Sequence, residues 1–392
     1  MSIYLDHNAT TPMDERVLEA MLPYLREQYG NPSSAHQRGR TARAALDAAR
    51  EQVAALVNVH PSQVVFTGGG TEANNLALMG IAGRSSAGHL VISAMEHDSI
   101  RAPAKALQKR GWLRDEVGLD SQGRVDVEQL RKTLVAMQTT TSNPGAAKLL
   151  AVMLANNETG VINDITAVAA QSREAGAVLL VDAVQAAGKL PVDFGAMGAQ
   201  LMSLSAHKIY GPKGVGALIV DKAIDMEPLL HGGGHEKGRR AGTENVAAIV
   251  GFGRAAELAR EAVSARHVQL RLLRDHLEQR LSAEMPELSI FGQRAERLPN
   301  TSFFAAPGVD GETLLMSLDQ AGLAVSSGSA CSTGEVEPSH VLMAMGIEAG
   351  LARGAVRVSL GKDSRRDEVD SFVDGFKRQV RMLQSFSSVA CA

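Results

Sequence analysis

The chain has 392 residues, of which 45% are hydrophobic and 21% are charged, and its formal net charge is −3. This balance is ordinary for a soluble globular protein and argues against a nucleic-acid-binding surface, which needs a clustered basic excess. No stretch approaches the roughly 18 apolar residues of a membrane span, and the N-terminus lacks the basic and apolar parts of a secretory signal. Two cysteines, Cys331 and Cys391, make no disulfide framework, so a cytoplasmic location is expected.

Helical and strand patterns alternate along the first half of the chain. Residues 44–57 carry apolar side chains at three-to-four spacing, which predicts a helix. Continuous apolar runs, typical of strands covered on both sheet faces, occupy residues 64–68, 89–97, 149–158, 177–185 and 217–221. Together they predict a three-layer α/β fold with a mostly parallel sheet. Residues 136–147 have a polar Ser/Thr/Pro centre and predict an exposed loop.

The pattern changes after Thr243. Residues 247–285 predict one long helix, and LSIFG, TSFFA and residues 355–361 predict strands of a different sheet. We therefore expect a smaller α+β domain at the C-terminal end. The expected division is a large domain over residues 16–258 and a small domain made of residues 1–15 and 259–392.

Lys208 and Asp182 each follow or end a predicted strand. An exposed loop lysine is most often only a solvated charge, but a desolvated lysine can form a Schiff base. Asp182 lies at the strand end where open α/β sheets bind ligands, although it could instead cap a helix. With Gln185 just beyond, the pair suits a pyridine cofactor, because a carboxylate that keeps the ring nitrogen protonated makes the ring an electron sink.

Other candidate groups are weaker when taken alone. The glycines of FTGGGTEANN lead into a predicted helix whose free N–H groups suit a phosphate, but glycines also mark plain turns. His97 follows another strand end and could stack on a cofactor ring and move protons, although a lone histidine is more often structural. His231 and His235 flank three glycines and are not expected to form a metal pair. Cys331 lies among small polar residues, whereas a buried structural cysteine usually has apolar neighbours. Its thiol is therefore expected to be accessible.

Together these motifs resemble the cysteine desulfurases of the NifS/IscS group, which belong to the fold-type I enzymes that use pyridoxal 5′-phosphate (PLP). The resemblance runs almost end to end. It is carried by LDHNATTP, GNPSSAH, FTGGGTEANN, MEHDS, ANNETG, VDAVQAAGK, SAHKIYGPKGVG, RRAGTENV, LPNTS and SSGSACSTGEVEPSHVLMAMG. The long motif around Cys331 resembles the NifS/IscS branch rather than the SufS-type branch.

The resemblance implies a role for each matching residue. Lys208 would carry PLP, Asp182 would pair with the pyridine nitrogen, Gln185 would bond the ring hydroxyl and His97 would stack over the ring. The phosphate would be held by Gly70, Thr71, Ser205, His207 and, from the second subunit of a homodimer, Thr243. Asn157, itself close to the cofactor, and Arg357 would clamp the carboxylate of L-cysteine.

Cys331 would be the nucleophile, on a mobile loop over about residues 326–340. It would take the substrate sulfur as a persulfide, leave L-alanine, and pass the sulfur to an iron–sulfur scaffold protein of the IscU/NifU kind.

Other interpretations stay open at this point. A selenocysteine lyase or an aminotransferase would use the same fold and cofactor, and transamination needs no thiol. A non-catalytic sulfur-carrier module is a further alternative. A nucleotide-binding protein built on the TGGGTE loop would leave Lys208 and Cys331 unexplained.

Overall fold

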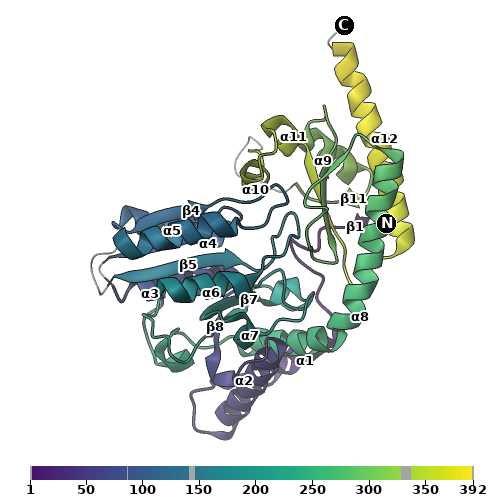
Figure 1. Ribbon diagram of the computed structural model, residues 1–392. Coiled ribbons are helices and arrows are strands. Elements are labelled where there is room, and N and C mark those ends of the chain that lie inside the picture. Colours follow the sequence, from purple (N-terminus) through teal and green to yellow (C-terminus); the bar gives the residue numbers. More distant parts are fainter. Residues whose placement is uncertain (1, 86, 141–145, 328–336, 391–392) are drawn as a thin grey trace.

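The computed structural model describes residues 2–85, 87–140, 146–327 and 337–390. Its main sheet has seven strands in the order β2-β8-β7-β6-β5-β3-β4 (Figure 1). Their bounds are β2 Val64–Thr67, β3 Gly88–Ser93, β4 Leu113–Val117, β5 Ala147–Met153, β6 Val178–Asp182, β7 Leu201–Ser205 and β8 Gly216–Val220. Strand β8 is antiparallel to both neighbours and the other pairs are parallel. The prediction of a mostly parallel sheet is confirmed.

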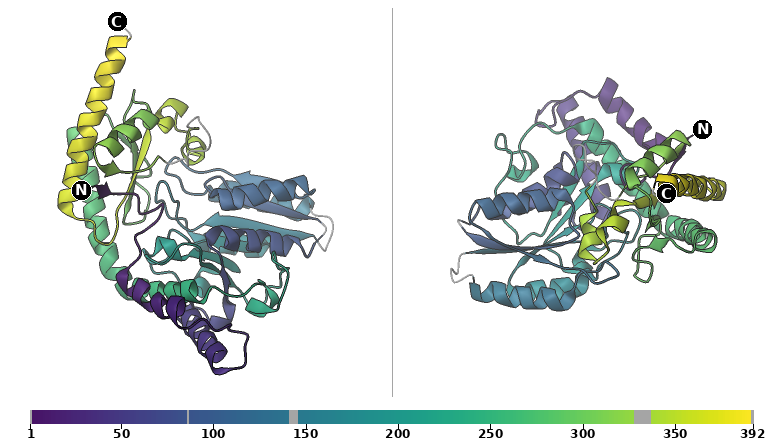
Figure 2. Two further views of the ribbon diagram at one scale, coloured as in Figure 1. Left: turned by 180° about the vertical axis from the view of Figure 1, so that it is seen from behind. Right: turned by 90° about the horizontal axis from the view of Figure 1, so that it is seen from above.

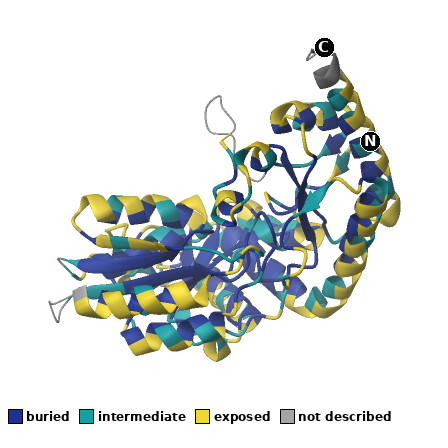
Figure 3. Ribbon diagram, turned by 45° about the horizontal axis from the view of Figure 1, so that its top comes forward, coloured by how far each residue is buried: buried dark blue, intermediate teal, exposed yellow. Residues whose placement is uncertain are grey.

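Helices cover both faces of this sheet, which confirms the three-layer prediction. Along β3, Leu90 and Ile92 pack into one apolar cluster and Val91 into another, because successive strand residues point to opposite faces. The sheet strands inside the edge strand β4 are mostly buried, while the helices expose their outer sides (Figure 3). The first cluster includes residues of α3 (Gly70–Ala82) and α4 (Asp98–Lys109), and the second includes residues of α1 (Glu15–Arg26), α2 (Gln37–Leu56), α5 (Val127–Thr140), α6 (Ile165–Ala175) and α7 (Phe194–Met197).

A second, smaller body is built around a three-stranded antiparallel sheet (Figure 2). Its strands are β9 (Ser289–Ile290), β10 (Thr301–Ala305) and β12 (Ala355–Ser359), and β1 (Ile3–Tyr4) pairs with β11 (Leu323–Ala324). Its helices are α9 (Gly311–Gln320), α10 (His340–Ala344), α11 (Ala349–Arg353) and α12 (Arg366–Ala390). The core contains three aromatic side chains in mutual contact, Phe304, Phe372 and Phe376.

One long helix, α8 (Val246–Glu284), belongs to both bodies (Figure 1). Its residues up to Ala259 pack into the core of the main sheet, and those from Leu270 pack into the small core together with Leu5. We propose the domain division expected from the sequence, 16–258 against 1–15 with 259–392, and this change of core along α8 supports it.

The structure differs from the sequence-based elements at a few places. The helix predicted over residues 44–57 is α2, which begins earlier, at Gln37, and ends at Leu56. The loop predicted over 136–147 is wrong up to Thr140, because α5 continues to that residue. Strand β4 was not predicted, since at the sheet edge its sequence LRDEV is mostly exposed and polar. Within the described ranges, no helix combines the length and the apolar character needed to cross a membrane.

Candidate active site

The carboxyl ends of the parallel strands meet at one edge of the main sheet and bring the predicted residues together. There they face a cavity of about 620 Å³ that the small body helps to line. The predicted residues that line it are Gly70, Thr71, His97, Asn157, Asp182, Gln185, Ser205, His207, Lys208 and Arg357. All but Arg357 come from the ends of, or the turns after, the strands of the main sheet, and Arg357 comes from β12.

Two predicted residues are not part of this group. Thr243 is exposed and is not among the described residues that line the cavity. Cys331, with most of its predicted loop, lies outside the described residues. The nearest described residues on either side of Cys331 are Ser327 and Glu337. Both line the cavity.

Lys208 ends a short 3-10 helix that directly follows β7. Its Nζ donates to the backbone oxygens of Asn8 and Ala9, each at 2.6 Å. Burial, and after it the charge of the nearby Arg357 guanidinium, lower the pKa of the Lys208 amine to about 8 against the opposing effect of Asp6 and Asp182. A sizeable fraction of the amine is therefore neutral near physiological pH and can act as a nucleophile or base.

Asp182 is buried at the end of β6 and its two oxygens have separate donors. Asn74 Nδ2 donates to Oδ2 at 2.8 Å, and the backbone N–H of Val184 donates to Oδ1 at 2.9 Å. Residues 183–190 form turns rather than a helix, so the helix-cap alternative does not apply. Asn74 was not singled out from the sequence, although it lies in the FTGGGTEANN motif, one turn after the glycines.

His97 is both a structural and a cavity residue. It caps α4, where its Nδ1 accepts from the backbone N–H of Ser99 at 3.1 Å. A neutral ring whose Nδ1 accepts a hydrogen bond carries its proton on Nε2. The cap thus fixes the tautomer of a ring that lines the cavity.

The amino end of α3, beside β7, is the predicted anion cradle. Gly69 has φ of +149°, and a Cβ atom on Gly70 would lie 2.9 Å from Val184 Cγ2 and 3.5 Å from Ser205 Cβ. Backbone N–H groups can approach a phosphate closely at such a helix start. Burial and the charges of Lys208 and Lys213 lower the pKa of His207 to about 4, so its ring is a neutral hydrogen-bonding partner.

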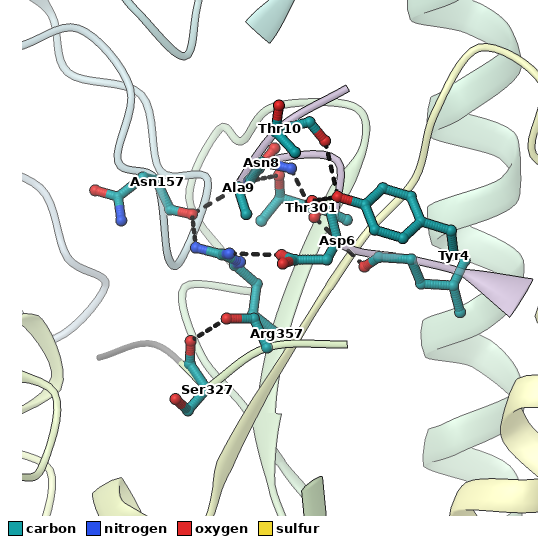
Figure 4. A network of polar contacts seen from close by, with 12 residues as sticks. Tyr4, Asp6, Asn8, Ala9, Thr10, Asn157, Thr301, Ser327 and Arg357 are labelled. Carbon is teal, nitrogen blue, oxygen red and sulfur yellow. Dashed lines mark hydrogen bonds and ion pairs between the residues drawn. The ribbon is translucent and has the colours of Figure 1, made fainter. Parts of the chain in front are cut away.

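Arg357 lies on β12 of the small sheet and lines the cavity, and two hydrogen bonds hold its guanidinium in place (Figure 4). Its Nη1 donates to the backbone oxygen of Asn157 at 3.0 Å and its Nη2 to Asp6 Oδ1 at 2.7 Å. Its Nε is buried without a partner in the described part of the chain. The side-chain amide of Asn157 points away from Arg357 (Figure 4). A positioned guanidinium with an unused donor suits a carboxylate ligand.

These groups fit PLP. A partly neutral lysine suits an aldehyde, a hydrogen-bonded carboxylate suits a protonated pyridine nitrogen, and a glycine-rich helix start suits a phosphate. The guanidinium of Arg357, a residue that lines the cavity, suits a carboxylate-bearing substrate. The N-terminal segment was not assigned a place at the site from the sequence, because nothing local indicates that Asp6 and Asn8 return to it.

Comparisons with known proteins identify the family of the chain. Residues 3–372 match the aminotransferase class-V family. The chain is 40% identical over 387 residues to the cysteine desulfurase IscS of Dictyoglomus turgidum, covering 98% of this chain and 96% of the relative. It is 42% identical over 388 residues to a cysteine desulfurase of Cereibacter sphaeroides, covering 98% and 97%.

Solved structures show the same fold. A NifS-like protein superposes with a TM-score of 0.88 at 36% identity, covering 98% of this chain and all of the other. The structure described as SspA in complex with cysteine superposes with a TM-score of 0.77 at 30% identity, covering 92% and 99%. The chain therefore belongs to the PLP-dependent class-V aminotransferase family, among the cysteine desulfurases.

Proposed function

We propose that this protein is a cysteine desulfurase that converts L-cysteine into L-alanine and retains the sulfur as a persulfide on Cys331. The observation that carries the proposal is the convergence, in one cavity, of Lys208, Asp182 and Arg357. The names of the relatives and the cysteine-bound SspA structure support cysteine as the substrate.

Each of these cavity residues has a separate role in the proposed reaction. When bound, PLP draws electrons away from the Cα atom of the amino acid. Arg357 binds the substrate carboxylate, and Asp182 holds a proton on the ring nitrogen. Lys208 Nζ takes the proton from Cα, for which a pKa near the working pH is favourable. His97 Nε2 holds a proton beside the reacting atoms.

Cys331 supplies the acceptor for sulfur. Its thiolate attacks the substrate sulfur, because the thiol is a poor nucleophile. The S–S bond forms as the Cβ–S bond breaks, and the bonding electrons stay with the carbon. Carbon is thereby reduced and sulfur oxidised, so that L-cysteine and one enzyme thiol give L-alanine and one enzyme persulfide. The cavity positions of Ser327 and Glu337, on either side of the Cys331 segment, support this assignment.

We further propose a homodimer in which Thr243 contributes to the phosphate site of the other subunit. The exposure of Thr243 supports this arrangement. The proposed sulfur acceptor is an iron–sulfur scaffold protein of the IscU/NifU kind, in line with the IscS name of the relative.

The test is an assay of alanine and sulfide from L-cysteine without any keto acid, on the wild type and on Cys331→Ala. The wild type should release alanine and, with a thiol reductant, an equal amount of sulfide. Cys331→Ala should bind PLP normally and lose both products. Alanine formed only when a keto acid is added would indicate an aminotransferase, and turnover that survives in Cys331→Ala would reject the nucleophile.

A further inference from the structure

A second lysine lies buried behind the cavity and takes no part in the reaction proposed above. Lys189 is 6% exposed, and its Nζ donates to Gln185 Oε1 at 2.7 Å and to Asn8 Oδ1 at 2.8 Å. No acidic group pairs with it in the described ranges. A buried lysine is costly unless its donors are used, and here both recorded acceptors are side-chain amides.

A lysine amine donates hydrogen bonds to these acceptors, so both amides turn their oxygen toward it. Asn300 Nδ2 also donates to Asn8 Oδ1, at 3.0 Å. Gln185 must turn Oε1 toward Lys189, so its Nε2 lies on the other side, where it donates to the backbone oxygen of Asn8 at 2.9 Å. Asn8 likewise turns Oδ1 toward Lys189 and Nδ2 toward Thr301 Oγ1 at 2.9 Å. An amide nitrogen has two hydrogens. The contact with Asn8 uses one hydrogen of Gln185 Nε2, and Gln185 lines the cavity.

We infer that Lys189 is a positioning residue that fixes the amide of Gln185 so that the cavity presents a hydrogen-bond donor, not an acceptor, to the ring oxygen of the bound cofactor. The inference rests on the proposed function, because it takes PLP as the occupant of the cavity. The inference assigns a role to Lys189, which does not itself line the cavity but contacts Gln185, which does.

The charges around Lys189 agree with this role. Burial lowers its pKa well below the ordinary lysine value, and Lys208, Arg357 and Arg266 add to the effect. A neutral amine still has the two hydrogens that the two contacts require. Lys189 can therefore fix both amides without a full positive charge beside Lys208.

The experiment measures PLP binding and the pH midpoint of the visible absorbance of the PLP-loaded protein. Lys189→Met should raise the PLP dissociation constant about 3- to 10-fold, the effect of losing about one buried hydrogen bond. The midpoint should move upward by about half a pH unit or more, because a donor to the ring oxygen favours the deprotonated form of the lysine-linked cofactor. Lys222→Met, at an exposed lysine, is the matched control and should change neither value.

A double-mutant cycle separates positioning from a general structural or charge effect. In a Gln185→Leu background, Lys189→Met should shift the midpoint no further. An equal shift in both backgrounds, or none in either, would overturn the inference. Gln185→Glu keeps an acceptor for Lys189 and replaces the donor by an oxygen, so it should also raise the midpoint, which tests the donor role of Gln185. If Lys189→Met does not fold, Lys189→Leu, which also removes the amine, takes its place, and an unchanged midpoint in that variant would overturn the inference. A wild-type protein that does not bind PLP would instead reject the proposed function.

Discussion

Arg357 and Asp6 form an ion pair at the cavity wall, with Nη2 and Oδ1 2.7 Å apart and the arginine side chain 6% exposed. The pair joins the N-terminal segment to β12 and leaves Arg357 Nε without a protein acceptor in the described ranges. Asp6 thus fixes the direction of the guanidinium that we propose binds the substrate carboxylate. The two residues are 351 positions apart in the sequence.

Arg357→Lys tests the carboxylate site. Lysine keeps the charge but loses the planar set of donors, so we expect KM for L-cysteine to rise about tenfold or more. Steady-state alanine production gives KM and kcat separately. Arg353→Lys, at an exposed position, should behave as wild type. An unchanged KM in Arg357→Lys would remove this residue from substrate binding.

The pH dependence of cofactor attachment tests the lowered pKa of Lys208. Because the neutral amine attacks the aldehyde, the attachment rate should follow the neutral fraction, about one tenth at pH 7 and one half at pH 8 for a pKa of about 8. The rate of absorbance change after adding PLP to the apo-protein should rise about fivefold over that interval and level off above about pH 9. A rate that still rises tenfold per pH unit at pH 9 would contradict the environment described for this amine.

Glu96→Gln should remove a pH-dependent loss of stability. Burial raises the pKa of Glu96 to about 8, with Asp182 adding to the effect, and its Oε2 has no partner in the described residues. The folded protein keeps this proton at pH values where the unfolded chain has lost it. The contribution of Glu96 to stability is therefore full below pH 4.5 and falls as the pH rises toward 8.

Glutamine has no such proton to lose. Relative to wild type, Glu96→Gln should gain roughly 2–4 kcal/mol in the free energy of unfolding between pH 5 and pH 8. Urea unfolding of the apo-protein at the two pH values measures this difference, with the exposed Glu19→Gln as control. If the change in the free energy of unfolding between the two pH values is the same in Glu96→Gln as in Glu19→Gln, Glu96 does not titrate in this range.

Gly70→Ala should weaken the anion cradle. The added methyl group would lie 2.9 Å from Val184 Cγ2, and relieving that contact has to move either the start of α3 or the turn after Asp182. We expect the PLP dissociation constant to rise about tenfold, within the range of overpacking effects. Gly195→Ala, where the nearest atom is 3.5 Å away, should bind PLP normally. Equal binding by both variants would place the phosphate elsewhere.

The sequence by itself determined the layered sheet and most of the cavity residues. Runs such as LLVD predicted strands correctly, because a strand covered on both faces must be apolar along its whole length. Asp182 and Lys208 could be picked out because a polar group that ends such a run lies at a shared edge of a parallel sheet.

Only the tertiary structure decided what surrounds these groups. The contacts of Asp6 with Arg357, of Asn74 with Asp182 and of Lys189 with Asn8 depend on how the N-terminal segment, α3, β6 and β12 converge. No local pattern encodes them, because hydrogen bonds between distant segments depend on the packing of the whole chain. The lowered pKa of Lys208 has the same origin, since burial and neighbouring charges exist only in the folded protein.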